Sequence, residues 1–149
     1  MQKITPFLWF DNNAEEAMNH YVSIFKDSKV LNVHRAGDSV MSVTFELEGQ
    51  QFMALNGGPE FSFTPAISLF VSCETQEEVD ELWAKLAEGG EEGKCGWLKD
   101  RFGVSWQIIP TALGRLMGDR DRRKAGRVMD AMLQMQKINI AGLEKAYNG

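Results

Sequence analysis

The sequence predicts an α+β protein in which one βαβββ unit occurs twice in tandem and is followed by helices. Two short apolar runs each precede a stripe of apolar residues at helical spacing and then further strand-like runs. When the sequence is aligned with itself at an offset of 61 residues, Leu8 matches Leu69, Tyr21 matches Leu82 and Phe25 matches Leu86. A single copy of about 60 residues buries little surface. We therefore expect the two copies to share one sheet or barrel.

The first predicted unit covers residues 1–60. Residues 5–10 form an apolar strand, and Asn13 with Glu16 has the spacing of a capping box for the helix after it. Residues 29–35, 40–47 and 51–55 predict a meander of three strands, with turns at Gly37 and Gly49. The apolar stripe of the helix consists of Ala14, Ala17, Met18, Tyr21, Val22 and Phe25.

The second predicted unit covers residues 61–110. It begins with a strand at 66–72, and Thr75 with Glu78 predicts a second capping box. Gly89 and Gly90 end the helix, and strands at 94–99 and 104–109 come next. Between these strands we expect Asp100 to close a turn through its side chain and Gly103 to take a positive φ.

Residues 111–149 predict a C-terminal extension with helices at 111–117, 119–136 and 140–147. Basic residues gather between Arg120 and Arg127. They either contact phosphate or form a solvated face balanced by neighbouring aspartates, and the second interpretation is favoured. The methionines of the extension, among them Met132, predict a packing or dimer surface.

Composition excludes several classes of protein. With 44% apolar residues, 16 basic and 21 acidic residues and a net charge of −5, the chain is typical of a folded domain and not of a general nucleic-acid binder. We find no apolar run of about 18 residues and no signal-peptide pattern, so we expect no membrane partner and a cytoplasmic location. Cys73 and Cys95 have no metal-binding spacing and predict reduced thiols, with Cys95 in a strand; a reactive Cys95 beside Lys94 or Lys99 is the alternative.

A resemblance expected to cover essentially the whole chain, including the helical tail, is carried by four segments: ITPFLWFDNNAEEAMNHY, FELEGQQFMALNGGPEF, AISLFVSCETQEEVDELWAKL and CGWLKDRFGVSWQIIP. They resemble the PhnB-like, or 3-demethylubiquinone 3-methyltransferase-like, branch of the vicinal-oxygen-chelate superfamily, which includes glyoxalase I, extradiol dioxygenases and bleomycin-resistance proteins. The resemblance implies a curled mixed sheet around an open cavity. It also implies a homodimer in which the subunits share elements.

The superfamily implies a divalent metal held by His, Glu or Gln on the first and last strand of each unit. Strand alternation assigns these four positions to Thr5, Ala54, Ala66 and Gln107, of which only Gln107 can coordinate. His20 on a helix and His34 on a strand lack a metal-binding spacing. We therefore expect no bound metal.

A methyltransferase would need a binding site for S-adenosylmethionine, which usually lies on a glycine-rich turn between a strand and a helix. The sequence can be searched for such a turn. Neither strand-to-helix turn, at 11–13 and 73–75, contains glycine, and the Gly57-Gly58 pair opens no helix. The sequence thus predicts no cofactor and names no catalytic residue.

Without a metal, alternation predicts a cavity lined by aromatic and neutral polar residues. The leading hypothesis is a metal-free protein that binds a small planar, apolar or mildly polar molecule and forms a homodimer. The alternatives are an enzyme of the same superfamily, either a 3-demethylubiquinone 3-methyltransferase or a metal-dependent lyase, isomerase or dioxygenase, and a scaffold dimer with a vestigial cavity. Core packing is the competing role for the rings at 52 and 70. The predicted ligand-binding residues are Phe7, Trp9, Phe52, Asn56, Ser68, Phe70, Ser105 and Gln107.

Overall fold

The computed structural model describes residues 2–149 and divides into two compact units. Unit 1 ends at Phe63, and unit 2 runs from Thr64 to Gly149. Each unit contains a four-stranded mixed sheet, which confirms the predicted α+β class. Within the described residues no helix is long and apolar enough to cross a membrane.

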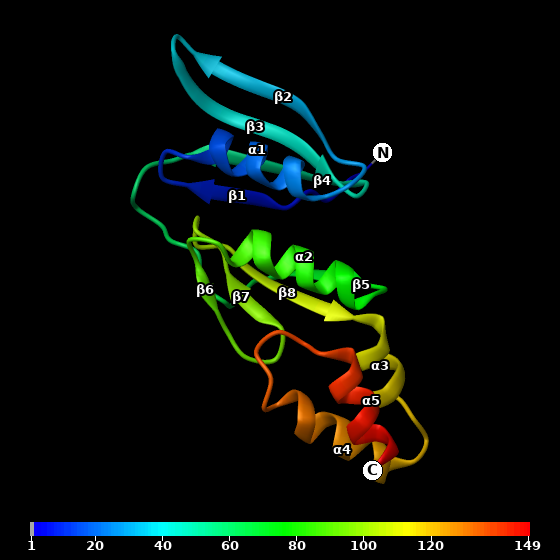
Figure 1. Ribbon diagram of the computed structural model, residues 1–149. Helices are drawn as coiled ribbons and strands as arrows, with labels where there is room; N and C mark the ends of the chain where they lie inside the picture. Colours follow the sequence, from blue (N-terminus) through cyan, green and yellow to red (C-terminus); the bar gives the residue numbers. More distant parts are fainter. Residues whose placement is uncertain (1) are drawn as a thin grey trace. The chain divides into compact units, whose positions relative to one another are not determined.

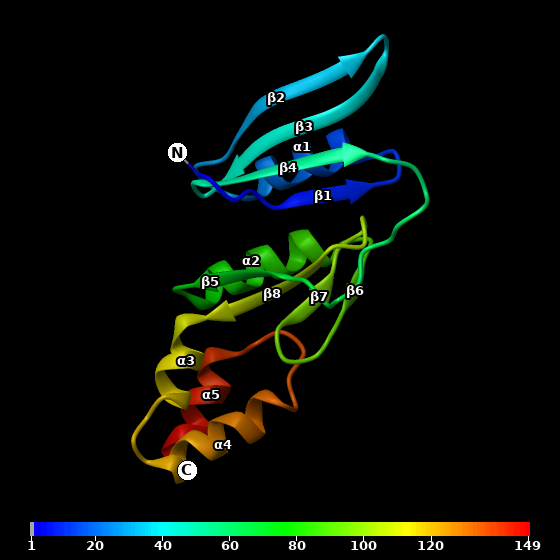
Figure 2. The same ribbon diagram turned by 180° about the vertical axis from the view of Figure 1, so that it is seen from behind.

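Unit 1 has the predicted βαβββ order (Figures 1 and 2). Its elements are β1 (Phe7–Phe10), α1 (Ala14–Ile24), β2 (Lys29–Ala36), β3 (Ser39–Leu47) and β4 (Gln50–Asn56). The strands lie in the order β1-β4-β3-β2, with β1 parallel to β4 and the other pairs antiparallel. The predicted turn between β3 and β4 is confirmed, because Glu48 and Gly49 both have positive φ, as a tight hairpin turn requires.

Helix α1 covers one face of this sheet and forms the core of unit 1 with it. Its buried positions are Ala14, Ala17, Met18 and Tyr21, which confirms the predicted stripe. Opposite them lie the buried strand residues Leu8, Phe10, Val43, Phe45, Leu47, Phe52 and Ala54. The expected cap of α1 is wrong in one respect, because the side chain of Asn13 makes no capping hydrogen bond.

Unit 2 repeats this topology, and its last three strands are shorter than those of unit 1. Its elements are β5 (Leu69–Cys73), α2 (Gln76–Ala87), β6 (Glu91–Glu92), β7 (Trp97–Lys99) and β8 (Ser105–Pro110). The order is β5-β8-β7-β6, again with the first strand parallel to the last. The second capping box is confirmed, since the Thr75 hydroxyl accepts a hydrogen bond from the Glu78 amide at 3.2 Å.

Two predicted strands of unit 2 are too long. The segment at 64–67 is a turn, because the Thr64 hydroxyl accepts a hydrogen bond from the amide of Ala66 at 3.3 Å, so β5 begins only at Leu69. Cys95 lies in a loop and not in a strand, with φ +59° at Cys95 and +85° at Gly96. A left-handed backbone cannot continue a strand, which is why β7 begins at Trp97.

Asp100 organises the turn between β7 and β8 as predicted. One of its carboxylate oxygens accepts hydrogen bonds from the amides of Phe102 and Val104 at 2.9 and 3.0 Å. The other accepts one from the Trp106 indole at 2.8 Å. Gly103 has φ +94°, also as expected. This carboxylate is buried and is tied to three donors, so it holds the turn against the sheet.

The C-terminal extension contains α3 (Thr111–Met117), α4 (Arg122–Met132) and α5 (Ile140–Asn148). The predicted helix at 119–136 is shorter because Asp121 caps α4 by accepting hydrogen bonds from the amides of Arg123 and Lys124. The three helices enclose a small core of Ile109, Leu113, Leu116, Val128, Ile138 and Leu143. Met132 packs against this core, and the homodimer stays a prediction.

Hydrogen bonds between backbone groups, and from the side-chain amide of Gln76, join the C-terminal extension to the rest of unit 2. The amides of Cys95 and Gly96 donate to the carbonyls of Met135 and Gln136, both at 2.8 Å. The Gln76 side chain donates to the Ile138 carbonyl and accepts from the Ile140 amide at 3.1 and 2.7 Å. The extension is therefore an integral part of unit 2.

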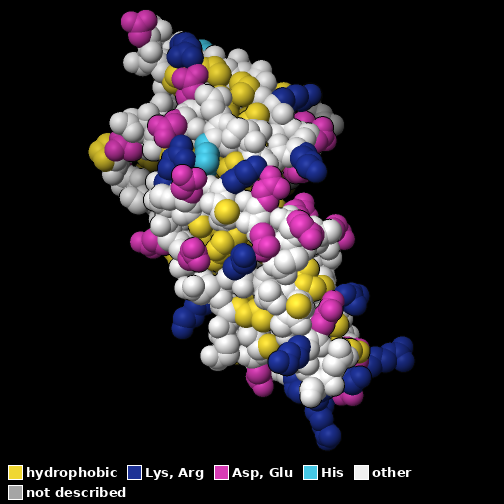
Figure 3. Space-filling view, viewed as in Figure 1, with side chains coloured by type: hydrophobic (Ala, Val, Ile, Leu, Met, Phe, Trp, Pro, Cys, Tyr) yellow, Lys and Arg dark blue, Asp and Glu magenta, His cyan; other side chains and the backbone are white. Residues whose placement is uncertain are grey.

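Lys and Arg side chains project from the part of the surface formed by the C-terminal helices (Figure 3). Two of the predicted basic residues serve local structure. Arg127 donates to the carbonyls of Ala146 and Tyr147 at the end of α5, both at 2.8 Å. Arg122 donates to the Asp119 carbonyl at 2.8 Å.

Candidate functional site

The candidate site is built from the open face of each sheet, defined here as the face that the α-helix of the same βαβββ repeat does not cover. In unit 1 the register pairs Phe7 with Met53 and Trp9 with Leu55. Paired residues on parallel neighbours point to the same side, so these four side chains share the open face. Phe7 is 53% exposed and Trp9 is half-buried.

The predicted positions on β4 are wrong by one residue. Phe52 and Ala54 point to the helix-covered face, where Phe52 is 7% exposed and stacks on Phe45 with ring centroids 5.5 Å apart. A shift of one residue moves a whole strand's side chains to the other face. Both alternating sets of β4 are apolar, so hydrophobicity could not choose between them. Met53 and Leu55 take the places that the sequence assigned to Phe52 and Asn56.

Asn56 has a structural role at the start of α1. Its side-chain oxygen accepts a hydrogen bond from the Ala14 amide at 2.9 Å, and its side-chain nitrogen donates to the Val40 carbonyl at 3.1 Å. Asn56 therefore replaces Asn13 as the side-chain cap of the helix. No local pattern reveals this contact, because Asn56 and Ala14 lie on different elements.

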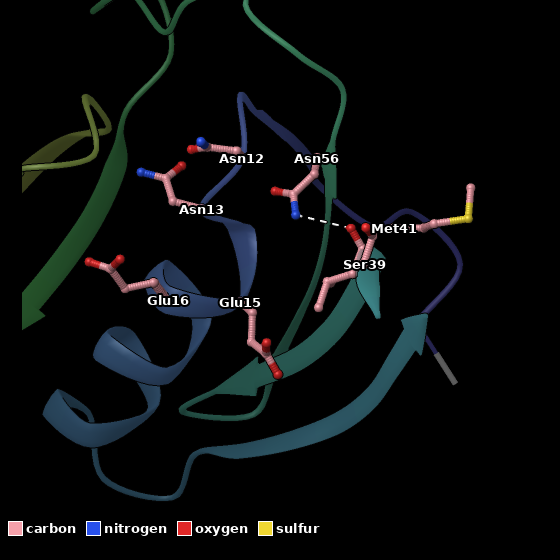
Figure 4. A pocket seen from close by; sticks show the side chains of 8 residues that line it. Asn12, Asn13, Glu15, Glu16, Ser39, Met41 and Asn56 are labelled. Carbon is pink, nitrogen blue, oxygen red and sulfur yellow. Dashed lines mark hydrogen bonds between the residues drawn. The ribbon is translucent and has the colours of Figure 1, made fainter. Parts of the chain in front are cut away.

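An open pocket of about 730 Å³ surrounds this cap (Figure 4). Its lining residues come from the start of α1, the beginning of β3 and the end of β4: Asn12, Asn13, Glu15, Glu16, Ser39, Val40, Met41 and Asn56. Both polar groups of Asn56 are used by the backbone, and Glu15 pairs with Arg35 at 2.8 Å. Asn56 and Glu15 thus serve the packing of α1 against the strands of unit 1.

The environment of Trp9 contains residues that the sequence did not predict. The indole N–H donates to the Gly58 carbonyl at 3.0 Å. The Phe61 ring lies 4.9 Å from the indole ring, at an interplanar angle of 78°. The Asn56-Gly57-Gly58-Pro59 sequence signals a turn but does not show that the turn passes over a tryptophan.

The open face of unit 2 brings together the predicted residues of β5 and β8. Phe70 pairs with Gln107 in the ladder and is 59% exposed, so core packing does not account for it. The Gln107 side-chain nitrogen donates to the Ser68 hydroxyl at 3.0 Å. Ser105 is two residues from Gln107 on the same face, and it is buried.

The donor set at the superfamily's metal positions does not fit a divalent ion. Two of the four assigned positions are not where they were expected. On β4, Met53 and not Ala54 lies on the open face, and Ala66 lies in a turn outside β5. Across residues 2–149, no three His, Cys, Asp or Glu side chains are grouped as metal ligands. His34 shares the open face of unit 1, but it is three strands from Trp9, about 14 Å at ~4.8 Å per strand.

Cys73 is not a nucleophile at neutral pH. Burial raises the pKa of its thiol to about 12, and the nearby carboxylates of Glu78 and Glu74 act in the same direction. The thiol therefore remains protonated and behaves as a small apolar side chain at the end of β5.

Comparison with known proteins places the chain in a family. The family model described as 3-demethylubiquinone-9 3-methyltransferase matches residues 2–109, which include both βαβββ repeats. The chain belongs to this family. The match ends one residue before the end of β8, so the C-terminal helices, which the resemblance was expected to include, lie outside it.

Three solved structures are similar to this chain to different degrees. A PhnB protein from Bacillus cereus is 41% identical, with a TM-score of 0.70 over 73% of this chain and 99% of that one. Protein PA1353 from Pseudomonas aeruginosa has the same fold, with 23% identity and a TM-score of 0.65 over 74% and 98% of the two chains. A glyoxylase/bleomycin resistance protein/dioxygenase domain from Frankia matches with 15% identity and a TM-score of 0.48 over 74% and 92%. A search of curated proteins found no match.

The family's name implies a methyl donor, and the turns of this chain do not fit S-adenosylmethionine. Both sheets are mixed, whereas the usual site lies on a doubly wound parallel sheet. At the start of α1 the Ala14 amide is already bonded to Asn56, and at the start of α2 the Glu78 amide is bonded to Thr75. At each of these helix starts, one of the backbone amides that could bind a cofactor's anionic group is thus already bonded to a side chain.

Proposed function

We propose that this member of the 3-demethylubiquinone-9 3-methyltransferase family binds a small planar organic molecule without a resident metal ion. The observation that carries the proposal is the open face of unit 1. There the 53% exposed Phe7 and the half-buried Trp9 lie beside Met53 and Leu55. Burial of such apolar surface contributes about 25 cal/mol per Å² to binding. An aromatic ligand would therefore gain most of its affinity from contact with these rings.

The polarity of the surrounding positions supports an uncharged ligand. On β3 the residues that pair with Met53 and Leu55 are Thr44 and Ser42. Hydroxyl groups at this place offer hydrogen bonds to a mildly polar substituent without imposing a charge.

The residues Ser68, Phe70, Ser105 and Gln107 on unit 2 remain proposed ligand-binding residues. The Gln107 side-chain nitrogen is oriented by Ser68, which leaves its carbonyl oxygen as the acceptor for a ligand N–H or O–H. A fixed amide of this kind gives specificity for the position of a polar group.

The test uses the full chain after treatment with a chelator. Thermal shift against planar aromatic metabolites identifies a ligand, and titration then gives its dissociation constant for the parent and for Trp9→Ala. We expect binding without added metal and at least a tenfold loss in Trp9→Ala. The control is Val30→Ala, which changes an exposed apolar residue of edge strand β2. Binding that returns only when a divalent ion is added contradicts the proposal, and stabilisation by S-adenosylmethionine favours an enzyme.

A further inference from the structure

The segment after β4 is folded closely over Trp9. The Gly57 amide donates to the Phe10 carbonyl at 2.8 Å, and the Gly58 amide donates to the Asp11 carbonyl at 3.1 Å. These bonds continue the contact between β1 and β4 beyond the last paired strand residues. The backbone of Gly57 and Gly58 is thereby held against the end of β1, where Trp9 lies.

This backbone fixes the position of the indole. The Trp9 N–H is bonded to the Gly58 carbonyl, so it is not available to a ligand. A Cβ atom at Gly57 would lie 2.4 Å from the Trp9 ring carbons Cε2 and Cζ2, well inside their contact distance. Position 57 therefore accepts only glycine while the indole keeps this orientation.

The same segment presents one ring to the core and one to solvent. Phe63 packs edge-on against the buried Phe10, with ring centroids 5.1 Å apart. Phe61 packs nearly perpendicular to Trp9 and remains 58% exposed. A flat ligand that contacted both rings would have its face on one ring and its edge against the other.

We propose that Trp9 and Phe61, here termed the aromatic corner, bind a neutral planar aromatic group by stacking, and that Gly57 is the positioning residue that holds the corner open. This inference rests on the proposed function and adds Phe61 and Gly57 to it. Because the indole N–H is occupied, the group is selected by its flat shape and not by a hydrogen bond from Trp9.

The first experiment compares 1-naphthol with its saturated counterpart, decahydro-1-naphthol, which has the same hydroxyl but is not planar. Binding is followed by the NMR signals of the four tryptophan indole N–H groups, with the Trp9 signal assigned from Trp9→Phe. We expect 1-naphthol to shift the Trp9 signal and to bind at least fivefold more tightly than the saturated alcohol. Equal affinities, or no shift at Trp9, overturn the inference.

The second experiment tests the two added residues. Phe61→Leu keeps apolar bulk but removes the ring, and we expect it to weaken 1-naphthol binding at least threefold. Leu133→Ala, an exposed apolar position of unit 2, is the matched control and should leave the affinity unchanged. Loss of affinity in Trp9→Ala without any loss in Phe61→Leu overturns the aromatic corner but leaves the proposed function standing.

Gly57→Ala has a readout that does not depend on binding. The added methyl group displaces the indole, so we expect the Trp9 N–H to lose its bond to Gly58 and to exchange with solvent at least tenfold faster. The control is Gly126→Ala, because a Cβ atom there meets no other atom within 4 Å. Circular dichroism verifies that both glycine variants are folded. If Gly57→Ala does not fold, the binding measurement on Phe61→Leu tests the aromatic corner instead. An unchanged exchange rate in folded Gly57→Ala overturns the positioning role.

Discussion

The two units share one topology but differ on their open faces. The Trp9–Leu55 pair of unit 1 corresponds to the Phe70–Gln107 pair of unit 2, because each lies on the parallel first and last strands. Unit 1 presents Met53 and Leu55 where unit 2 presents Ser105 and Gln107. The helix-covered faces are apolar in both. Stability thus constrains one face of the repeat, whereas the other is available for function.

The units also differ near the end of the last strand. In unit 1 the chain continues into Gly57, whose backbone lies against the Trp9 ring. In unit 2 the corresponding residue is Ile109, which joins the core of the C-terminal helices. The same place in the repeat therefore supports the half-buried Trp9 in one unit and anchors a helical extension in the other.

The largest expected effect concerns the turn before each unit's last strand. Asp100→Ala leaves two backbone amides and the buried Trp106 indole without their charged acceptor, and we expect the free energy of unfolding to fall by about 4 kcal/mol. In unit 1, Gly49→Ala places a side chain at φ +84° and should cost about 1 kcal/mol. Urea denaturation of both variants measures the difference. Equal losses would show that the carboxylate does not organise unit 2.

The helix caps provide the next comparison. Asn56→Ala removes hydrogen bonds to both the Ala14 amide and the Val40 carbonyl, so we expect a loss of about 2 kcal/mol. Thr75→Ala removes one local cap from α2 and should cost about 1 kcal/mol. Urea denaturation is again the measurement. A larger loss in Thr75→Ala would contradict the capping role of Asn56.

A smaller effect is expected when the open face of unit 1 is given an amide side chain like that of Gln107 in unit 2. Leu55→Gln places a polar group on a partly exposed position, and the free energy of unfolding should change by at most about 1 kcal/mol. Affinity for 1-naphthol should fall severalfold, because the amide is less favourable beside an apolar ring. Titration of the variant against Leu55→Met separates polarity from shape. Unchanged affinity in Leu55→Gln would remove Leu55 from the binding face.

The smallest effect is a pH dependence confined to unit 2. The hydrogen bond from the Tyr147 hydroxyl to Asp119, at 2.6 Å, lowers the pKa of Asp119 below 3.8 and raises that of Tyr147 above 10.0. The contribution of Asp119 is therefore present above pH 3.8 and lost at lower pH, and that of Tyr147 is present below pH 10.0 and lost at higher pH. In thermal melts, the melting temperatures of the parent and Tyr147→Phe should differ between pH 3.8 and pH 10.0 and become equal outside this range. A difference that does not vary with pH would exclude this bond as its cause.

Local features of unit 2 were predictable because each depends on residues close together in the chain. Thr75 caps a helix that begins at the next residue, and Asp100 bonds to amides two and four residues away. The extent of β5 and the loop at Cys95 were not predictable from apolar content, since a hydroxyl bond at Thr64 and a left-handed backbone end those strands.

The candidate site was only partly predictable. Phe7 and Trp9 were assigned to the open face by strand alternation alone, because every residue of β1 is apolar. Phe52 and Asn56 were assigned to the wrong face because β4 is apolar on both sides. Phe61 and Gly57 were missed because their contact with Trp9 joins segments that are distant in sequence.

The amino-acid sequence by itself determined the repeated βαβββ order, the apolar stripes of α1 and α2 and the Thr75 cap of α2, since these depend on the spacing of neighbouring side chains. Only the tertiary structure decided which side chains of β4 lie beside Trp9 and which residue caps α1. Register between distant strands is set by the packing of whole faces, and no local pattern contains that information.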